Sequence, residues 1–274
     1  MFLEKADNRR RVANLLIKAA RKKDGRAFNS LLEQDDANEV QAILNVALLL
    51  AVLKNDEDAV QMLLDHGANA NADNGDGNTA LLWAAGNGYA KITRMLLEHG
   101  AHVETKDALG RTALILATMN NHEDAVQALF AHNADVNAKD DRDFTALMWA
   151  AGNGKGNPGV VRALLDRHAR IDVQNDTGNT ALILATMNNN VDIVRELLDR
   201  GADASLKNRY GDTALKWAES KGHKEIADLL KQAAAKEPQV KTAPAQKTEA
   251  GTWRGRPALS GPAVTLSPPA PKNI

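Results

Sequence analysis

The chain of 274 residues is long enough for one large domain or two ordinary ones, and its 44% hydrophobic and 25% charged residues suit a soluble globular protein. It contains no cysteine, which excludes disulfides, thiolate metal sites and a cysteine nucleophile. The longest apolar run, residues 42–53, is too short to span a bilayer, and the first residues lack the apolar core of a secretory signal. We therefore expect a cytoplasmic protein without membrane segments.

The formal net charge of −1 conceals an uneven distribution. Residues 1–26 carry a net charge of +6 and residues 236–274 a net charge of +4, so the part between them carries −11. An acidic body argues against nucleic acid as its main ligand. The plainer interpretation of the basic ends is a solvated capping helix and a solubilising tail.

Residues 9–39 predict two helices, around 12–21 and 27–34. Their charged surface suits an N-terminal cap, assigned to residues 1–40, that covers the next element on one side and faces water on the other.

From residue 41 onward the sequence repeats itself. A phrase of the type Thr-Ala-Leu-x-x-Ala begins at five threonines with spacings of 33, 33, 35 and 33 residues: Thr79, Thr112, Thr145, Thr180 and Thr213. A second phrase, such as Leu-Leu-Glu-His-Gly-Ala at 96–101, follows each of the first four. A degenerate copy lies one period earlier, at Val46, which makes six repeats.

Each repeat predicts two short helices and a turn. Thr79 can cap the first helix, and Gly88 supplies a left-handed residue that ends it. Apolar residues then line one face of a second helix that ends at Gly100. The segments 107–110 and 175–178 are typical of tight turns that project as hairpin fingers.

These residues resemble the ankyrin repeat, whose pattern is D-x-x-G-x-T-P-L-H-x-A-A-x-x-G-H followed by an apolar helix that ends in G-A-D. The resemblance covers residues 41–235 and implies an all-α solenoid of stacked helix-turn-helix units with short β-hairpin fingers. The six repeats are 41–73, 74–106, 107–139, 140–174, 175–207 and 208–235. In every full repeat the Pro of the pattern is Ala and its His is Leu, Ile, Met or Lys, which puts the histidine-mediated ties between repeats in doubt.

A second regularity overlies the first. Repeats with a tryptophan (Trp83, Trp149, Trp217) alternate with repeats that read Leu-Ile-Leu-Ala-Thr-Met-Asn-Asn, at 114–121 and 182–189. The repeat at 46–64 is closest to the second type, so the array consists of three two-repeat units. Two irregularities, the extra residues placed within 155–159 and Asp143 at a glycine position, point to a binding site or to simple drift.

The C-terminal end differs from the inner repeats. The last repeat, 208–235, carries charged residues where inner repeats have smaller ones, as a terminal cap requires. Residues 236–274 hold seven of the eight prolines and are predicted to form a disordered Pro-rich tail.

No pattern in the chain predicts a catalytic residue, a metal ligand set or a cofactor. Tryptophans of alternate repeats would stand about 20 Å apart, too far for an aromatic cage, so core packing is the better interpretation. His66, His99 and His132 share a column with arginines at helix C-termini, which the helix dipole explains better than a metal does. Residues 73–78 lack the ligand pattern of an EF-hand, and no phosphate loop or hydrolase motif occurs.

The resemblance implies that a partner binds the finger tips and the concave face of the first helices. Leu109, Phe144 and Tyr210 are the strongest candidates, since large apolar residues exposed at a tip are costly unless they are used. Met119 and Met187 provide either adaptable contacts or core packing. The full set of candidates is Asp76, Asn78, Leu109, Arg111, Asp141, Arg142, Phe144, Asp176, Thr177, Arg209, Tyr210, Met119 and Met187.

We therefore expect a non-catalytic, monomeric scaffold that binds another protein through an acidic, concave face, with a basic patch on the partner. The alternative is that the array is a platform for its tail. Trp253, Arg254 and Arg256 form a basic, aromatic segment of the kind found in docking motifs or secretion addresses of translocated effectors. The sequence does not name the partner.

Overall fold

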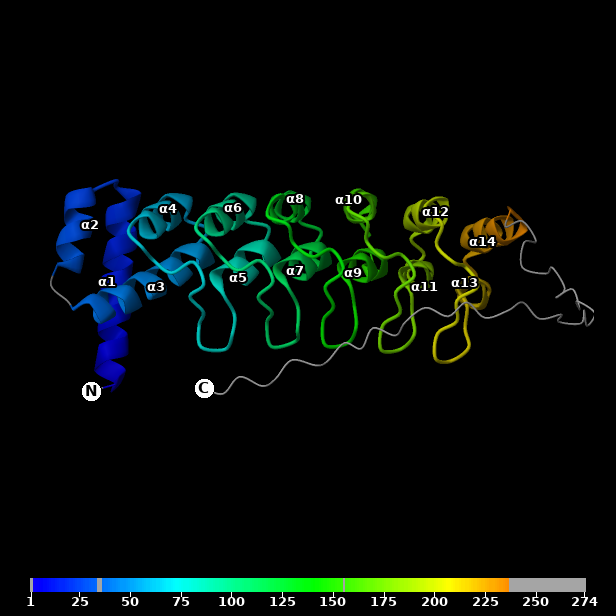
Figure 1. Ribbon diagram of the computed structural model, residues 1–274, viewed down its shortest axis with the longest axis horizontal. Coiled ribbons are helices and arrows are strands. Elements are labelled where there is room, and N and C mark those ends of the chain that lie inside the picture. The colour runs from blue at the N-terminus through cyan, green and yellow to red at the C-terminus, as the bar shows by residue number, and fades with distance from the viewer. Residues whose placement is uncertain (1, 34–35, 155, 237–274) are drawn as a thin grey trace, which may run out of the picture. The chain divides into compact units, whose positions relative to one another are not determined.

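The computed structural model describes residues 2–33, 36–154 and 156–236, which form fourteen helices (Figure 1). The predicted Pro-rich tail lies outside the described residues, apart from Lys236. From residue 37 onward the helices form two rows, and the fingers project on the side of the first-helix row (Figure 1). No helix in these ranges is long and apolar enough to cross a membrane.

The first helix of each repeat lies in one row and the second helix in the other. The first helices are α3 (Ala37–Leu53), α5 (Ala80–Gly86), α7 (Ala113–Met119), α9 (Ala146–Gly152), α11 (Ala181–Met187) and α13 (Ala214–Lys221). The second helices are α4 (Glu57–Asp65), α6 (Ala90–Glu98), α8 (Glu123–Ala131), α10 (Pro158–Asp166), α12 (Val191–Asp199) and α14 (Lys224–Lys236). The predicted all-α solenoid of helix-turn-helix units is confirmed.

The repeated threonine begins five of the first helices. In each case the threonine is extended and its hydroxyl oxygen accepts a hydrogen bond from the backbone N–H three residues later, at 3.2 to 3.4 Å. The alanine that follows is buried and small, which lets neighbouring repeats approach closely.

Left-handed residues end the helices, as predicted. Gly88 has φ +75° after α5, and Gly100 has φ +82° after α6. In the fourth repeat the connection between α9 and α10 is longer, residues 153–157 instead of three residues, so the two extra residues lie between the helices of that repeat. Asn157 accepts hydrogen bonds from the first turn of α10, and Pro158 occupies its first position.

The N-terminal cap consists of α1 (Phe2–Arg21) and α2 (Gly25–Leu32), so the first helix begins ten residues earlier than expected. α1 packs on α3, and Arg9 binds both carboxylate oxygens of Glu39 at 2.7 Å. α3 itself begins at Ala37, four residues before the expected repeat boundary at 41, because Asp36 accepts hydrogen bonds from the first backbone N–H groups of the helix.

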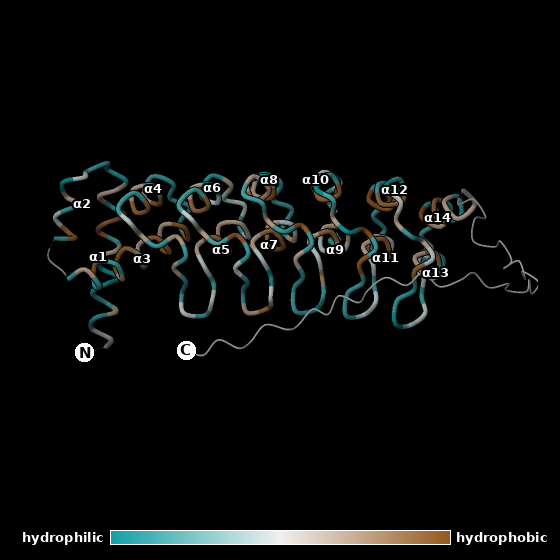
Figure 2. The backbone as a smooth tube through the Cα atoms, viewed as in Figure 1, coloured by the Kyte–Doolittle hydropathy of each residue, from teal (hydrophilic) through white to brown (hydrophobic). Residues whose placement is uncertain are grey.

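One continuous core lies between the two rows, from Ala13 to Leu230. Fully buried leucines and isoleucines such as Leu81, Ile92 and Leu96 fill it, while the finger tips are mostly hydrophilic (Figure 2). No single repeat encloses its own apolar side chains, so each repeat is stabilised by its neighbours.

Candidate partner-binding surface

The fingers are the segments 73–79, 106–112, 139–145, 174–180 and 207–213. Each finger is closed by a backbone hydrogen bond. The N–H of the residue five positions before the threonine donates to the carbonyl of the residue directly before the threonine, as from Asp107 to Arg111 at 3.0 Å. Isolated antiparallel bridges occur at three finger bases, Asp73 with Thr79, Lys106 with Thr112 and Lys139 with Thr145. The expected hairpins are therefore reduced to single bridges.

An Asp or Asn stands five residues before each threonine and shapes the finger. Its side-chain Oδ1 accepts two backbone N–H bonds, from the second and fourth residues after it, at 2.9 to 3.3 Å. The residues at this Asx position are Asn74, Asp107, Asp140, Asn175 and Asn208. This role was not predicted, although the recurrence at a fixed offset from the threonine is visible in the sequence.

Asp107 differs from the other Asx residues because it also binds a cation. Burial raises the pKa of its carboxyl, but the Arg111 side chain and the backbone N–H groups of Arg111 and Leu109 outweigh burial and lower the pKa below its ordinary value. The Arg111 Nε lies 2.7 Å from Oδ2. The predicted contact residue Arg111 is therefore half-buried and already paired inside its own finger.

Four of the fingers are joined to one another by backbone hydrogen bonds. The N–H of Asp141 donates to the carbonyl of Leu109 at 3.1 Å, that of Asp176 to Arg142 at 3.1 Å and that of Arg209 to Thr177 at 3.0 Å. Adjacent tips are so close that a Cβ at Gly178 would lie 2.7 Å from the nitrogen of Arg209. The tips from 107 to 212 thus form a fixed row.

The first finger, 73–79, stands apart from this row. No hydrogen bond between its backbone and the finger at 106–112 is found in the described part of the chain. Space around Gly75 and Gly77 is open, whereas Gly110 and Gly178 adjoin the next finger.

The predicted tip residues differ in exposure. Leu109 is 57% exposed and Tyr210 75% exposed, the two highest values among the large hydrophobic residues described. The other exposed candidates are Asp76, Asn78, Asp141, Arg142 and Arg209, and the half-buried ones are Arg111, Phe144, Asp176, Thr177, Met119 and Met187.

The expectation that Phe144 is exposed at a tip is wrong. Its ring centroid lies 4.8 Å from that of Trp149, and the Arg142 guanidinium lies 5.2 Å from the centroid of the Phe144 ring. Phe144 is therefore held against the first helix of its own repeat by Trp149.

Core packing holds for two of the three tryptophans of the array and fails for the third. Trp149 and Trp217 are half-buried and pack against the core, but Trp83 is 45% exposed. Met119 and Met187 are also half-buried and pack against the core.

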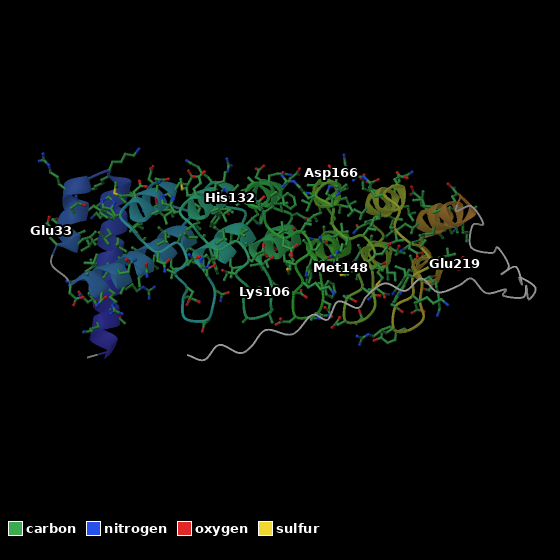
Figure 3. The ribbon with its side chains drawn as sticks, viewed as in Figure 1. Glu33, Lys106, His132, Met148, Asp166 and Glu219 are labelled. Atoms are coloured by element: carbon green, nitrogen blue, oxygen red, sulfur yellow. The ribbon has the colours of Figure 1, made fainter. Side chains whose placement is uncertain are left out.

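The first helices of four repeats do not carry the acidic charge expected of the concave face. Four consecutive stretches, 79–90, 112–121, 145–154 and 180–191, contain no Asp, Glu, Lys or Arg. The acidic charge lies instead on the fingers and the second helices. In Figure 3, Lys106 marks a finger, His132 and Asp166 the second-helix row, and Met148 the first-helix row.

Polar ties between repeats exist without the histidine of the family pattern. The backbone N–H groups that follow four of the second helices each donate to a side chain of the preceding repeat, as from His102 to the Oδ1 of Asn71 at 2.7 Å. The acceptors are Asn71, Glu104, Asn137 and Asp172. These ties are made by Asn, Asp and Glu side chains and involve no histidine side chain.

The column of histidines and arginines lies at the C-caps of the second helices, as predicted. His99 lies 3.4 Å from Asp65 of the preceding repeat. Within the described ranges no three histidine or acidic side chains are grouped as a metal site would require.

Comparisons with known proteins agree with this geometry. The chain matches the family model of ankyrin repeats (3 copies) over residues 16–107, 104–175 and 147–242. The crystal structure of the ankyrin repeat domain of Bcl-3, a member of the IkappaB protein family, is 28% identical, with a TM-score of 0.62 over 68% of this chain and 85% of that one. The ankyrin repeat protein EF0377 is 31% identical, with a TM-score of 0.63 over 68% of this chain and 96% of its own. No curated protein sequence matches. The chain belongs to the ankyrin repeat family.

Proposed function

We propose that the protein is a non-catalytic scaffold that binds a protein partner through its finger tips and its first-helix face. Ankyrin repeats are general protein–protein interaction modules, and repeat arrays present extended surfaces for this purpose. The observation that carries the proposal is the exposure of Leu109 and Tyr210 on tips whose backbones are fixed by hydrogen bonds between fingers.

Fixed tips favour binding because little conformational entropy is lost when a partner docks. The Arg209 N–H bond to Thr177 holds the backbone beside Tyr210, and the Asp141 N–H bond holds the carbonyl of Leu109. Both side chains thus project from a backbone that is already ordered.

The charge of the fingers supports a partner with a basic patch. Asp76 and Asp141 are exposed at the tips, Arg111 and Arg142 are paired with Asp107 and Asp176, and Arg209 is an exposed cation in the same row. The basic patch would face the tips and not the uncharged first helices. We propose a monomeric, cytoplasmic protein, and the acidic body supports a protein partner over nucleic acid.

Affinity capture with the full chain tests the finger-tip site. A Leu109→Ala and Tyr210→Ala double variant is compared with wild type, and partners are quantified by mass spectrometry. The matched control is Arg94→Ala with Gln127→Ala, which changes two exposed residues on the second helices α6 and α8. We expect at least about a tenfold loss of a specific partner for the tip variant alone. Equal recovery by all three proteins would contradict the finger-tip site.

A second function remains for the tail. Trp253, Arg254 and Arg256, together with the net +4 of residues 236–274, support a docking motif or a secretion address of a translocated effector. Deletion of residues 237–274 tests this alternative. If partner capture and localisation are both unchanged by the deletion, the tail has neither role.

A further inference from the structure

Three tryptophans occupy the same position, four residues after the capping threonine, and their surroundings differ. Trp149 has its ring against Phe144, and its indole N–H donates to the Oδ2 of Asp140 at 3.0 Å. Trp217 is half-buried with Lys221 at 5.8 Å from its ring. Trp83 is 45% exposed and has neither an aromatic neighbour nor an acceptor for its indole N–H in the described part of the chain.

The fingers in front of Trp149 and Trp83 differ, whereas Trp217 is half-buried without an aromatic neighbour and its indole N–H has no acceptor among the described residues. In the fourth repeat the residue before the threonine is Phe144, but in the second repeat it is Asn78, which is exposed. The Asx residue also changes from Asp140 to Asn74. An aspartate has a second oxygen for the indole, whereas the Oδ1 of an asparagine is taken by the finger backbone and its amide nitrogen is a donor.

A second exposed apolar residue stands next to Trp83 in the repeat geometry. Leu53 lies seven residues after the threonine-equivalent Val46, and this position contacts the tryptophan position of the following repeat. A Cβ at Gly86 would lie 3.5 Å from the Leu116 Cβ, and the same relation holds between Gly152 and Leu184 at 3.4 Å. From this relation we infer that Leu53, which is 46% exposed, lies beside Trp83 in the first two repeats.

The first-helix stretch that carries Trp83 is uncharged, whereas the exposed Lys54 follows Leu53 at the C-cap of α3. Residues 79–90 contain no charged side chain, and neither do residues 112–121, 145–154 and 180–191 of the next three repeats. A charged partner group placed here would lose hydration without gaining an ion pair. The site therefore favours an apolar group with a hydrogen-bond acceptor.

We propose that Trp83 and Leu53 form an anchor for a partner polypeptide that brings an aromatic side chain onto the indole ring and an uncharged acceptor oxygen to its N–H. The contacts that Phe144 and Asp140 make with Trp149 show the arrangement that the partner reproduces in trans. This inference rests on the proposed protein-binding function and specifies one part of its surface.

The indole ¹H–¹⁵N NMR signals of the four tryptophans test the anchor directly in the full chain. The probe is N-acetyl-L-phenylalaninamide, which carries an aromatic ring and amide oxygens, and N-acetylglycinamide is the control without a ring. Each signal is assigned with a Trp→Phe variant. We expect the phenylalanine probe to shift the Trp83 signal saturably and the Trp149 signal to stay in place.

Two reciprocal variants distinguish an anchor from a merely exposed ring. The double variant Asn74→Asp with Asn78→Phe gives Trp83 the two neighbours that Trp149 has in Asp140 and Phe144. In this covered variant the probe should no longer shift the Trp83 signal. Phe144→Asn with Asp140→Asn removes the cover of Trp149 and should create a second responding signal. Signal dispersion in each spectrum shows whether the variant is folded, and the first variant suffices if the second does not fold.

Several outcomes would overturn the proposal. These are no shift at Trp83, an equal shift with the glycine control, or a shift that survives in the covered variant. A Trp83 shift that grows with protein concentration in the absence of probe would assign the site to a second copy of this chain instead.

Peptide selection then tests the partner class and separates this proposal from the finger-tip function. Phage-displayed random peptides selected on wild type should be enriched in an aromatic residue with uncharged neighbours, and should bind the covered variant at least about tenfold more weakly. Enrichment of charged peptides would contradict the anchor. The finger-tip function and the anchor have separate readouts. Unchanged partner capture by the Leu109→Ala and Tyr210→Ala variant would contradict the finger-tip site alone. A missing Trp83 response would contradict the anchor alone.

Discussion

Asp140 joins the finger of the fourth repeat to its first helix, because its Oδ2 accepts the indole N–H of Trp149 at 3.0 Å while its Oδ1 accepts the N–H groups of Arg142 and Phe144. A single buried carboxylate thus fixes both the shape of a finger and the orientation of a tryptophan. Asp107 binds the Arg111 side chain in addition, and the Asn208 amide donates to the Oδ1 of Asn179 in the preceding finger, so the second partner of this backbone motif differs from repeat to repeat.

Asp140→Asn should separate these two roles. Asparagine keeps the oxygen that holds the finger, as Asn175 shows, but presents a donor to the indole N–H. We expect the free energy of unfolding, measured by urea denaturation, to fall by about 1–2 kcal/mol. In a Trp149→Phe background the same substitution should cost far less, and an equal loss in both backgrounds would contradict the proposed coupling.

Asp143→Gly should stabilise the protein. Asp143 has φ +59° at the finger position where the other fingers have glycine, and a left-handed conformation is unfavourable for residues with a Cβ. Its ion pair with Lys139 at 3.0 Å is exposed and contributes little. We expect a gain of about 0.5–1 kcal/mol in the free energy of unfolding.

The reverse substitution, Gly178→Asp, is the matched control for this prediction. Its Cβ would lie 2.7 Å from the backbone nitrogen of Arg209, so a loss of about 2 kcal/mol is expected. A loss of stability in Asp143→Gly would show that the Lys139 contact or the side chain itself outweighs the backbone strain.

The pair Asp107 and Arg111 should contribute to stability in a pH-dependent manner. The pKa of Asp107 is lowered in the folded protein, so its contribution is complete above the unfolded value of about 4 and is lost as the pH falls through the folded value. Asp107→Asn removes this contribution and keeps the acceptor for the finger backbone.

The comparison is made by urea denaturation of wild type and Asp107→Asn between neutral pH and acid. We expect wild type to be more stable by about 1–2 kcal/mol at neutral pH and the two proteins to converge as the pH falls. Every other carboxyl is common to both proteins, so a difference that stays constant into acid would assign the effect to packing.

Alanine substitutions of the three large residues predicted at the finger tips, Leu109, Phe144 and Tyr210, should differ in their effect on the free energy of unfolding. Phe144→Ala removes a ring that packs 4.8 Å from Trp149 and should lower the free energy of unfolding by about 1–2 kcal/mol. Leu109→Ala and Tyr210→Ala remove exposed side chains and should each change it by less than about 0.5 kcal/mol. A comparable loss in all three would mean that Leu109 and Tyr210 pack against the array in solution.

The repeat could be predicted from the sequence because its signals are local. A capping threonine, an alanine beside it and a left-handed glycine or asparagine act within one turn of chain, and their recurrence places six similar units in series. The candidate surface could be predicted only in part. Leu109 and Tyr210 are exposed as their finger positions indicate, whereas Phe144 faces Trp149.

By itself the sequence determined the fold, the helix caps, the position of the two extra residues in the fourth repeat and the alternation of repeat types, since each follows from backbone preferences and spacing. Only the tertiary structure decided which side chains of an identical phrase are covered. Trp83 and Trp149 have the same place in the repeat, but one is exposed and the other is packed under a ring and bonded to a carboxylate. The physical reason is that burial and hydrogen-bond satisfaction depend on residues of the finger and the adjoining repeat, which meet the tryptophan only once the array has stacked.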